Sequence, residues 1–399
     1  MATVLPFKAI RPNPQYADQL VFTKPQAESV AGDYTHEGGL KPLKTLLETG
    51  ARLRPETPEG QEMAYCDIKE TLRNLLRNEH LLDESEEALY VYEVTHPDYR
   101  QAGIWCLTDL TDYTEGKIRI HELTLADSVR RMRNYRANTG LEGSPVLLTY
   151  PPDGTINAVI SIVKVHRPDS TLGNAHGVHR LWKISDRHLQ QKLMDAFSKI
   201  PNSYLADGHH RFESAVSLAK PFRSLSSLYL SFDELRIEAY HRVVIPGTPY
   251  EKQSLFRELS KSFYIRESTV NRPVQPHEPQ RMGMYLHGQW YHLLAKDMNT
   301  PFGAEFLQHT ILSGIFDITD PKTDSRLKCA GGEKALEEIG AICQAHPGAI
   351  AFTLSPLTVA QLVAAADAGQ ILPPKSTWII PKVPYGLLIH QHPLHNERT

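Results

Sequence analysis

Five consecutive residues, Asp207-Gly208-His209-His210-Arg211, combine reactive side chains with a glycine that lets the backbone approach a ligand closely. An arginine can donate two parallel hydrogen bonds to phosphate oxygens. The two histidines can donate to a phosphate or transfer a proton near neutral pH. Asp207 can accept a proton or hold Mg²⁺. The alternative is an ordinary Asp-Gly turn and helix cap, but packing does not explain four such side chains in five positions.

The sequence around this motif predicts the elements that position it. Tyr204-Leu205-Ala206 is a short apolar run typical of a buried strand, and Phe212, Ala215 and Val216 recur at the spacing of one helix face. We therefore predict a strand-to-helix turn. Such a turn gathers backbone N–H groups and the positive end of a helix dipole, which together favour an anion.

Two other motifs could add chemistry. His121-Glu122 ends a strand-like stretch and is a candidate acid/base pair. A surface turn whose Glu122 complements a helix dipole is an equally good interpretation. In Pro373-Pro374-Lys375-Ser376-Thr377, two prolines stiffen a turn that carries three donors suited to phosphate, Lys375, Ser376 and Thr377. Taken alone, this stretch favours a helix stop followed by an exposed turn.

Weaker patterns lie elsewhere. Arg130, Arg133 and Arg136 recur on one helix face, which is usually solvated but could line an anionic pocket. The loop from Asp317 to Asp324 has three carboxylates without EF-hand spacing, so Asx turns and caps explain it better than a cation. The other histidine-rich stretches predict no zinc site, because catalytic zinc needs three protein ligands; they are His176-x-x-His179 and a tail, expected to be solvated, with His390, His392 and His395.

Composition limits the class of protein. The chain has 399 residues, of which 41% are hydrophobic and 22% charged, as in an ordinary globular protein of two or three domains. A net charge of −3 argues against a nucleic-acid partner. We find no apolar run long enough for a membrane span. The four cysteines form no C-x-x-C pair, which predicts reduced thiols in a cytoplasmic protein.

Strand and helix patterns alternate, so the expected fold is α/β or α+β with mixed sheets. We predict an α/β domain over residues 1–245 that contains the Asp207–Arg211 motif, and an α+β domain over 250–399 that contributes the Pro373–Thr377 turn. The linker is Pro246-Gly247-Thr248-Pro249. Expected strands are 89–94, 103–108, 146–150, 157–164, 349–354, 378–380 and 387–389, with a hairpin at His287-Gly288. Expected helices are 58–78, 123–137, 187–199, 209–220, 250–262, 303–315 and one from Thr358 to Gly369.

Several of these motifs occur in an order that resembles the domain-of-unknown-function 1015 family of bacteria and archaea, over nearly the whole chain. They are Pro6-Phe7-Lys8-Ala9-Ile10-Arg11-Pro12, His121-Glu122-x-Thr124, His179-Arg180-Leu181-Trp182, Leu205 to Arg211, His241-Arg242-Val243-Val244 and Pro373 to Thr377. Family members commonly carry a Pro-Pro-Tyr-Asp-Val-like segment near residues 23–30. This chain keeps one proline there and lacks the Tyr-Asp, which implies a different substrate if that segment shapes the pocket.

The Asp207–Arg211 motif is also similar to the phosphate-binding motif of the ParB/sulfiredoxin superfamily, which includes free-serine kinases, sulfiredoxins and CTP-binding partition proteins. The opening Ile10-Arg11-Pro12-Asn13-Pro14 resembles the start of those domains. This resemblance implies a ParB/sulfiredoxin-like N-terminal region. It places Gly208, His209, His210 and Arg211 around phosphate and gives Asp207 a catalytic or metal role.

The leading expectation is a phosphotransferase that uses ATP or ADP, with Mg²⁺, on a small hydroxyl metabolite, free serine first. Arg211 and His209 would clamp the phosphate, Asp207 or Glu122 would take the hydroxyl proton, and Lys375 would hold a phosphate or carboxylate. A nucleotide-binding regulator and a phosphatase that uses the same residues remain alternatives. If the first interpretation holds, Arg211 lines a pocket, and the side chains of Asp207, Glu122 and Lys375 face one cavity within roughly 10 Å.

Overall fold

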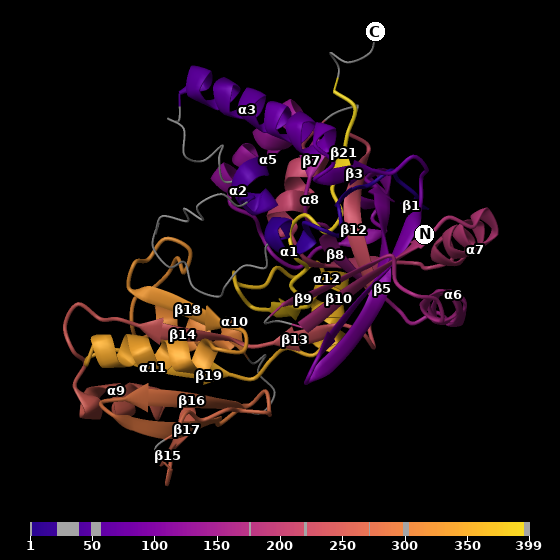
Figure 1. The fold of residues 1–399 in the computed structure, drawn as a ribbon. Helices are drawn as coiled ribbons and strands as arrows, with labels where there is room; N and C mark the ends of the chain where they lie inside the picture. Colours follow the sequence, from indigo (N-terminus) through magenta and orange to yellow (C-terminus); the bar gives the residue numbers. More distant parts are fainter. Residues whose placement is uncertain are drawn as a thin grey trace. The chain divides into compact units, whose positions relative to one another are not determined.

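The computed structural model describes residues 2–21, 40–48, 57–174, 177–218, 222–270, 272–297 and 303–394. The fold is mixed α/β, as expected, and the chain divides into two compact units (Figure 1). The first unit comprises Met1–Ile120, Thr124–Leu235 and Pro381–Thr399. The second comprises His121–Leu123 and Arg236–Ile380. The segment 23–30, where the family's Tyr-Asp is missing, lies outside the described residues.

Within the described part of the first unit, a nine-stranded sheet has the order β6-β11-β8-β12-β5-β4-β10-β9, and β1 pairs with β5. The pairs β11–β6 and β12–β8 are parallel, and the other pairs are antiparallel. The strands are β1 Val4–Leu5, β4 Leu89–His96, β5 Tyr99–Asp109, β6 Ile118–Arg119, β8 Val146–Tyr150, β9 Ser170–Asn174, β10 Gly177–Ile184, β11 Ser203–Asp207 and β12 Ser224–Ser231.

Helices pack on this sheet through a shared apolar core. Ile156 and Val159 of α6 and Phe197 of α7 are buried with sheet residues such as Leu148 and Leu205. A continuous run of buried residues in β4 and β5 fits strands covered on both faces. The helices of this unit are α1 Ala17–Leu20, α2 Leu43–Leu47, α3 Pro58–Arg77, α4 Thr111–Thr114, α5 Ala126–Thr139, α6 Gly154–Lys164, α7 Arg187–Phe197 and α8 His209–Val216.

Two short strand pairs complete the first unit. β2 (Ile10–Pro12) pairs with β3 (Leu81–Asp83), and β7 (Leu141–Glu142) pairs with β21 (His390–Gln391). The second pair brings the end of the described chain into a separate core, where Tyr385 and Ile389 are buried with Ile10, Leu43 and Leu72. The C-terminal segment is therefore part of the first unit.

The second unit contains an antiparallel six-stranded sheet of order β15-β17-β16-β19-β14-β18, and β13 pairs separately with β20. Adjacent residues of β14 point to opposite faces. Val244 packs with α9 and a π-helix, whereas Val243 packs with α11. The elements are β13 Arg236–Glu238, β14 Tyr240–Val244, α9 Lys252–Leu259, β15 Phe263–Glu267, β16 Arg281–Leu286, β17 Gln289–Ala295, α10 Ala304–Phe306, the π-helix Leu307–Ser313, β18 Leu327–Gly331, α11 Ala335–Ala345, β19 Ile350–Leu354, α12 Val359–Asp367 and β20 Trp378–Ile380.

Several local predictions are confirmed. The strands around 89–94 and 103–108 pair as β4 and β5. His287-Gly288 connects β16 to β17 with φ of 47° and 84°, as a tight hairpin turn requires. Thr358 caps α12 through a capping box with Gln361, and Gly369 follows the helix with φ of 64°. Among the described residues, no helix is long and apolar enough to cross a membrane.

The prediction of a strand at 157–164 was wrong. These residues belong to helix α6. Asp153 caps the start of this helix, because its carboxylate accepts hydrogen bonds from the amides of Thr155 and Ile156. The predicted strand at 387–389 forms only a bridge at Ile389, and the strand itself is β21. The predicted helix at 303–315 is short α10 followed by the π-helix.

The chain divides at other residues than the expected 1–245 and 250–399. Residues 236–245 belong to the second unit because β14 lies inside its sheet, between β19 and β18. Residues 381–399 belong to the first unit because β21 pairs with β7. The chain thus leaves the first unit and returns to it.

Candidate functional site

The Asp207–Arg211 motif lies at a strand-to-helix turn, as its flanking sequence predicts. β11 ends at Asp207, Gly208 has φ 93° and ψ 27°, and α8 begins at His209. A Cβ atom at position 208 would lie 2.9 Å from Val146 Cγ1 and 3.0 Å from Arg211 Nη2. The turn therefore needs glycine twice over, for its left-handed backbone and for the space that the Arg211 guanidinium fills.

Asp207 forms an ion pair that the sequence did not indicate. Its Oδ2 lies 3.2 Å from Nζ of Lys382, and the two side chains are 38% and 42% exposed. Desolvation favours a higher pKa for Asp207, but the positive charges of Lys382 and Arg211 outweigh it and lower the pKa below its ordinary value. Asp207 is therefore a carboxylate at neutral pH, with two cations beside it.

The other motif side chains are held by the first unit itself. Arg211 is half-buried, and its Nη1 donates to the carbonyl of Pro145. His209 is buried at the start of α8. His210 Nε2 accepts the Leu125 amide at 2.9 Å, so the neutral ring carries its proton on Nδ1. These contacts fix the turn against the segment that leads into α5.

A buried ionic cluster lies in the same unit. The Glu142 carboxylate accepts from Arg136 Nη2 at 2.9 Å, from His392 Nε2 at 2.5 Å and from the Ser226 amide at 2.7 Å. Burial would raise the pKa of Glu142, but Arg136 and His392 hold it well below its usual range. Burial lowers the pKa of Arg136, and the positive charge of Arg211 lowers it further, whereas the Glu142 carboxylate raises it.

This cluster corrects one expectation about the tail. His390 and His392 are buried rather than solvated, because β21 pairs with β7. Burial and neighbouring His392 lower the pKa of His390 to about 4, so His390 is neutral near pH 7. His395 and His176 lie outside the described residues, and the predicted absence of a zinc site stays a prediction.

The second unit brings the two other predicted motifs together. Glu122 forms a parallel bridge with Leu372, and the Leu372 amide donates to the His121 carbonyl at 2.8 Å. His121 is fully buried and Glu122 is half-buried. The His121-Glu122 pair therefore lies beside Leu372, the residue that precedes the Pro373–Thr377 turn, although Glu122 and Leu372 are 250 positions apart in sequence.

The turn itself is held by an arginine from the His241-Arg242-Val243-Val244 strand. Buried Arg242 donates from Nη2 to the carbonyls of Pro374 and Lys375 at 3.0 and 3.1 Å. Lys375 has φ 59°, an uncommon conformation for a residue other than glycine. Its Nζ lies 5.9 Å from the centre of the Tyr240 ring. Arg242 therefore holds in place the backbone from which Lys375 projects.

The two hydroxyls of the turn are buried. Ser376 Oγ donates to the Pro373 carbonyl at 2.6 Å, which closes the turn, and Thr377 is also buried. In this conformation the Ser376 hydroxyl donates its proton to the Pro373 carbonyl and has none to donate to a phosphate. A phosphate-binding role therefore suits exposed Lys375 better than Ser376, and the proposed roles of all three stay predictions.

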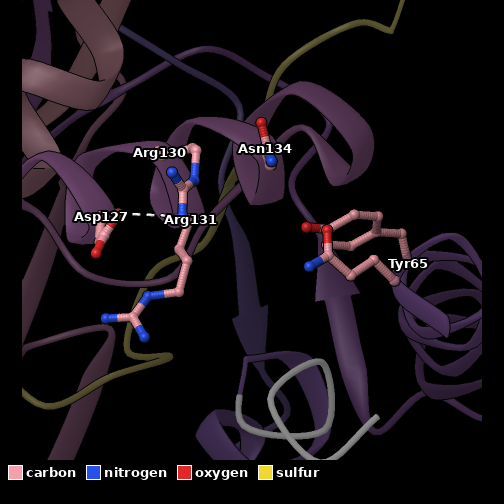
Figure 2. Close-up of a pocket in the computed structure, with 6 residues that line it drawn as sticks. Tyr65, Asp127, Arg130, Arg131 and Asn134 are labelled. Carbon is pink, nitrogen blue, oxygen red and sulfur yellow. Dashed lines mark ion pairs between the residues drawn. The ribbon is translucent and has the colours of Figure 1, made fainter. Parts of the chain in front are cut away.

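A cavity of about 330 Å³ lies between α3 and α5 (Figure 2). Arg130, from the predicted arginine stripe, lines it with Arg131, and Arg130 forms an ion pair of 3.0 Å with Asp127. Of the other stripe residues, Arg133 is exposed and Arg136 binds Glu142. Arg211 lines neither this cavity nor the one described below, so its expected place in a pocket stays a prediction.

The described residues hold no group of three or more histidine, cysteine, aspartate or glutamate side chains that could bind a metal. Asp207 therefore belongs to no such group and could offer a metal ion only its own carboxylate. A single carboxylate fits an Mg²⁺ ion that arrives with nucleotide phosphates, because Mg²⁺ is usually held by one or two carboxylates together with phosphate oxygens. It does not fit a resident metal bound by protein alone.

Lys382 and Arg242 are the residues that sequence reasoning missed. Lys382 follows a predicted strand and has no local feature that ties it to Asp207, 175 positions away. Arg242 was visible as part of a motif, but nothing in the sequence connects it to the turn at Pro374. Both were identified only from contacts between distant segments.

Comparison with known proteins bears out the family resemblance. Residues 4–316 match the family described as protein of unknown function, DUF1015, and the chain belongs to it. No curated protein matches the chain. The resemblance to ParB/sulfiredoxin domains rests on the Asp207–Arg211 motif and on the opening Ile10–Pro14 segment.

Three solved structures show distant similarity. A variant of a free serine kinase in complex with ADP is 12% identical, with a TM-score of 0.40, and the match covers 71% of this chain and 92% of that one. A conserved hypothetical protein from Pyrococcus furiosus is 13% identical, with a TM-score of 0.40 and coverage of 73% and 96%. SbnI with a C-terminal truncation, from Staphylococcus aureus, is 12% identical, with a TM-score of 0.39 and coverage of 69% and 82%.

Proposed function

We propose that this member of the DUF1015 family is a nucleotide-dependent phosphotransferase that acts on a small hydroxyl metabolite, with free serine as the first candidate. One observation carries the proposal. A carboxylate, a left-handed glycine and two cations, those of Arg211 and Lys382, gather at the first turn of helix α8. Phosphoryl transfer needs mainly positioning and charge neutralisation, and these groups supply both.

Each group has a role in this proposal. Arg211 and the amides that open α8 bind the transferring phosphate. Lys382 adds a second positive charge next to Asp207. Asp207 orients the acceptor hydroxyl, and Asp207 or Glu122 takes its proton. Because its pKa is lowered, Asp207 is a weak base, and we expect the proton to move only as the new P–O bond forms. His209 contacts phosphate, and His210 supports the turn through Leu125.

Mg²⁺ and ATP or ADP are the expected co-reactants. When bound, Mg²⁺ would neutralise phosphate charge, with Asp207 as its protein ligand. All four cysteines are free thiols, which fits the reducing cytoplasm as the place of this reaction. The partners we propose are therefore small molecules, a nucleotide and a hydroxyl metabolite.

We also propose that Glu122 and Lys375 serve the same substrate, Glu122 with His121 as an acid/base pair and Lys375 as the anchor of a phosphate or carboxylate. The Glu122–Leu372 bridge joins these two motifs. A crystal structure with ADP and serine should show both side chains within roughly 10 Å of Asp207, the size of a small-ligand pocket. If Lys375 projects away from the bound ligands, it has no part in the reaction.

The test is direct. Purified protein with Mg²⁺, ATP or ADP and free serine should form phosphoserine. Arg211→Ala should reduce the rate by about 10³-fold or more, because its guanidinium acts mainly on the transition state. Asp207→Asn should fail as well, and Lys375→Ala should mainly raise KM. Arg257→Ala, at an exposed position of α9, is the matched control and should keep full activity.

Two other results would replace the proposal. Tight nucleotide binding without transfer to serine, threonine or related hydroxy acids would identify a nucleotide-binding regulator. Release of inorganic phosphate from phosphoserine without a nucleotide would identify a phosphatase. Binding of neither nucleotide nor phosphoserine would exclude all three functions for the Asp207–Arg211 turn.

A further inference from the structure

A second cavity, of about 290 Å³, lies within the second unit, next to the Pro373–Thr377 turn. Its volume is near the lower end of small-molecule pockets, which begin at roughly 300 Å³. Ten residues line it: Leu123, Glu305, Gln308, His309, Pro321, Lys322, Ile371, Leu372, Pro373 and Pro374. None of them is among the residues that we assign to phosphoryl transfer.

One wall of this cavity is apolar. Leu123 and Ile371 are 56% and 38% exposed, and both are large apolar side chains that line this one cavity. The Glu122–Leu372 bridge holds their two segments together, and two prolines stiffen the backbone that follows. Exposed apolar side chains that are grouped and bordered by polar ones are typical of binding sites.

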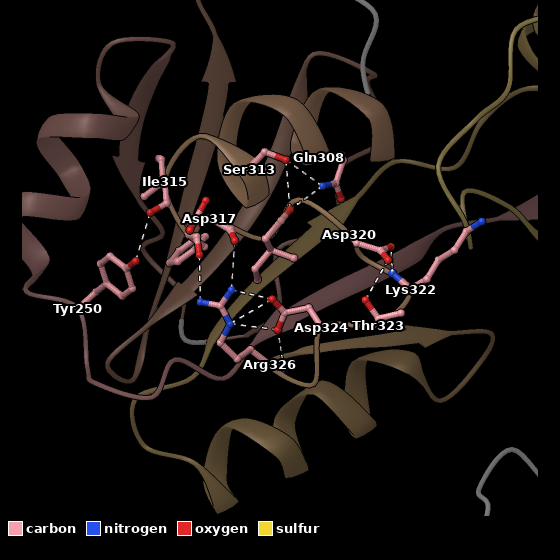
Figure 3. A network of polar contacts seen from close by, with 12 residues as sticks. Tyr250, Gln308, Ser313, Ile315, Asp317, Asp320, Lys322, Thr323, Asp324 and Arg326 are labelled. Carbon is pink, nitrogen blue, oxygen red and sulfur yellow. Dashed lines mark hydrogen bonds and ion pairs between the residues drawn. The ribbon is translucent and has the colours of Figure 1, made fainter.

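Pro321 and Lys322, from the acidic loop Asp317 to Asp324, also line the cavity, and Figure 3 shows how this loop is held. Arg326 donates to the carbonyls of Phe316 and Asp317 at 3.1 and 3.3 Å and pairs with Asp324 at 2.6 Å. Asp320 accepts from the Lys322 amide and the Thr323 hydroxyl, each at 2.9 Å. The carboxylates of Asp320 and Asp324 thus stabilise the loop, as the interpretation with Asx turns requires, and they fix the backbone at Lys322.

The π-helix Leu307–Ser313 connects this loop to the cavity. Gln308 is buried and donates to the Ile318 carbonyl at 2.8 Å and to Ser313 Oγ at 3.0 Å (Figure 3). Its neighbour His309 is exposed and lines the cavity. π-Helical turns occur often at functional sites. Here one turn both holds the loop and presents a histidine to the cavity.

Two charged side chains line the cavity, Lys322 and Glu305. Lys322 is cationic, and His309 is a donor on the same rim. The Glu305 carboxylate accepts the Gln370 amide at 2.8 Å, which partly satisfies it. We propose that this cavity binds a small molecule with an apolar body and one anionic group, a carboxylate or a phosphate, whose charge pairs with Lys322. This site does not depend on the proposed phosphoryl transfer.

Three fluorescent probes with one body test the proposal on the full-length protein: naphthoate, naphthyl phosphate and the uncharged naphthol. Both anions, or one of them, should bind with a Kd at least about tenfold lower than that of naphthol, because a charge-assisted hydrogen bond contributes that much. The anion that binds more tightly identifies the group that the site prefers. Equal affinity for all three probes, or no binding, would overturn the proposal.

Variants locate the binding. Lys322→Met keeps most of the stem and removes the charge, so it should raise the Kd of the anions about tenfold and leave that of naphthol unchanged. Lys328→Met, at an exposed position of β18 outside the cavity, is the control and should change neither. Ile371→Glu puts a carboxylate on the exposed apolar wall, where folding tolerates it, and should abolish anion binding. Unchanged affinity in both Lys322→Met and Ile371→Glu would place the probes elsewhere and overturn the site.

Discussion

The ion pair between Asp207 and Lys382 joins two segments of the first unit at its surface. Both side chains are more than a third exposed, and such pairs contribute about 0–1 kcal/mol. Lys382→Met should therefore lower the free energy of unfolding by less than about 1 kcal/mol. It should raise the pKa of Asp207 towards its ordinary value and slow phosphoserine formation.

Carboxyl NMR titration, urea unfolding and the transfer assay separate these effects. Lys261→Met removes the partner of Glu258 on the surface and should change only the local pair. A large loss of stability in Lys382→Met, with an unchanged Asp207 pKa, would contradict this view of the pair.

The Glu142 cluster should contribute more to stability than this exposed ion pair, because it is buried. Glu142→Gln leaves Arg136 as a buried charge without its counterion, which should cost about 3–5 kcal/mol near pH 7. Since the pKa of Glu142 is lowered by folding, its contribution is fully present above the unfolded pKa of about 4.3. It is lost as the pH falls from there towards the folded pKa.

Urea unfolding of the wild type and Glu142→Gln at several pH values measures this difference. It should be greatest near neutral pH and shrink below about pH 4.3, where the Glu142 carboxyl of the unfolded wild type begins to take up a proton while the folded one stays ionised. Glu115→Gln, on the exposed surface, should show a small difference throughout. A difference between the Glu142 proteins that is independent of pH would contradict the assignment.

Residues that are adjacent in sequence were the ones that sequence analysis could identify. Asp207 and Arg211 belong to one turn, so their types and spacing already predict an anion site. Lys382 and Arg242 act through contacts with segments more than a hundred positions away. Such contacts depend on the whole fold, and no local pattern announces them.

At the scale of elements, the turn between β11 and α8 depends on Gly208. Gly208→Ala adds a Cβ in a left-handed conformation and 3.0 Å from the Arg211 guanidinium. We expect a loss of about 1–3 kcal/mol in stability, together with weaker phosphate binding as Arg211 shifts. The matched control is Gly154→Ala at the start of α6, where the space is open and φ is not positive.

Thermal unfolding and a phosphate-binding titration compare the two variants. Gly154→Ala should be neutral or add about 0.4–1 kcal/mol, because alanine loses less entropy on folding. Equal stability of the two variants would show that the turn relaxes without cost and that Gly208 is not required there.

Helix α6 shows why some elements were misassigned. Val159, Ile160, Ile162 and Val163 are β-branched, and a short run of such residues fits a buried strand as well as a helix. The Asp153 cap and the burial of Ile156, Val159, Ile160 and Val163 on one face decide for the helix. The Pro-Pro-Asp-Gly sequence was interpreted as a hairpin turn, although its aspartate could also begin a helix.

At the scale of the whole molecule, the sequence predicted two units. It assigned the tail, residues 381–399, to the second unit, whereas the structure places it in the first. The linker signal of Pro246 to Pro249 lies ten residues after β13 begins the second unit's sheets. A strand at the end of a chain carries no sign of the partner with which it pairs. The return of residues 381–394 to the first unit could therefore be seen only from the pairing of β21 with β7.

This arrangement predicts that the two units differ as fragments. Residues 236–380 contain every strand of the six-stranded sheet and both of its cores, so this fragment should fold alone and unfold cooperatively. Residues 1–235 lack buried Tyr385, Leu387, Leu388 and Ile389. Burying four such side chains contributes about 6–12 kcal/mol as an upper estimate, comparable with the whole stability of a typical domain, about 5–15 kcal/mol.

We therefore expect fragment 1–235 to show no cooperative unfolding transition by circular dichroism in urea, since it also loses the His392 partner of Glu142. Joining residues 381–399 to residue 235 through a flexible linker should restore the transition, because the segment can then pair with β7 again. The same linker joined to a segment 381–399 that carries Ile389→Asp should not restore the transition. The aspartate would bury a charge in the core with Ile10. Cooperative unfolding of 1–235 alone would mean that the returning segment covers the first unit without being needed for its fold.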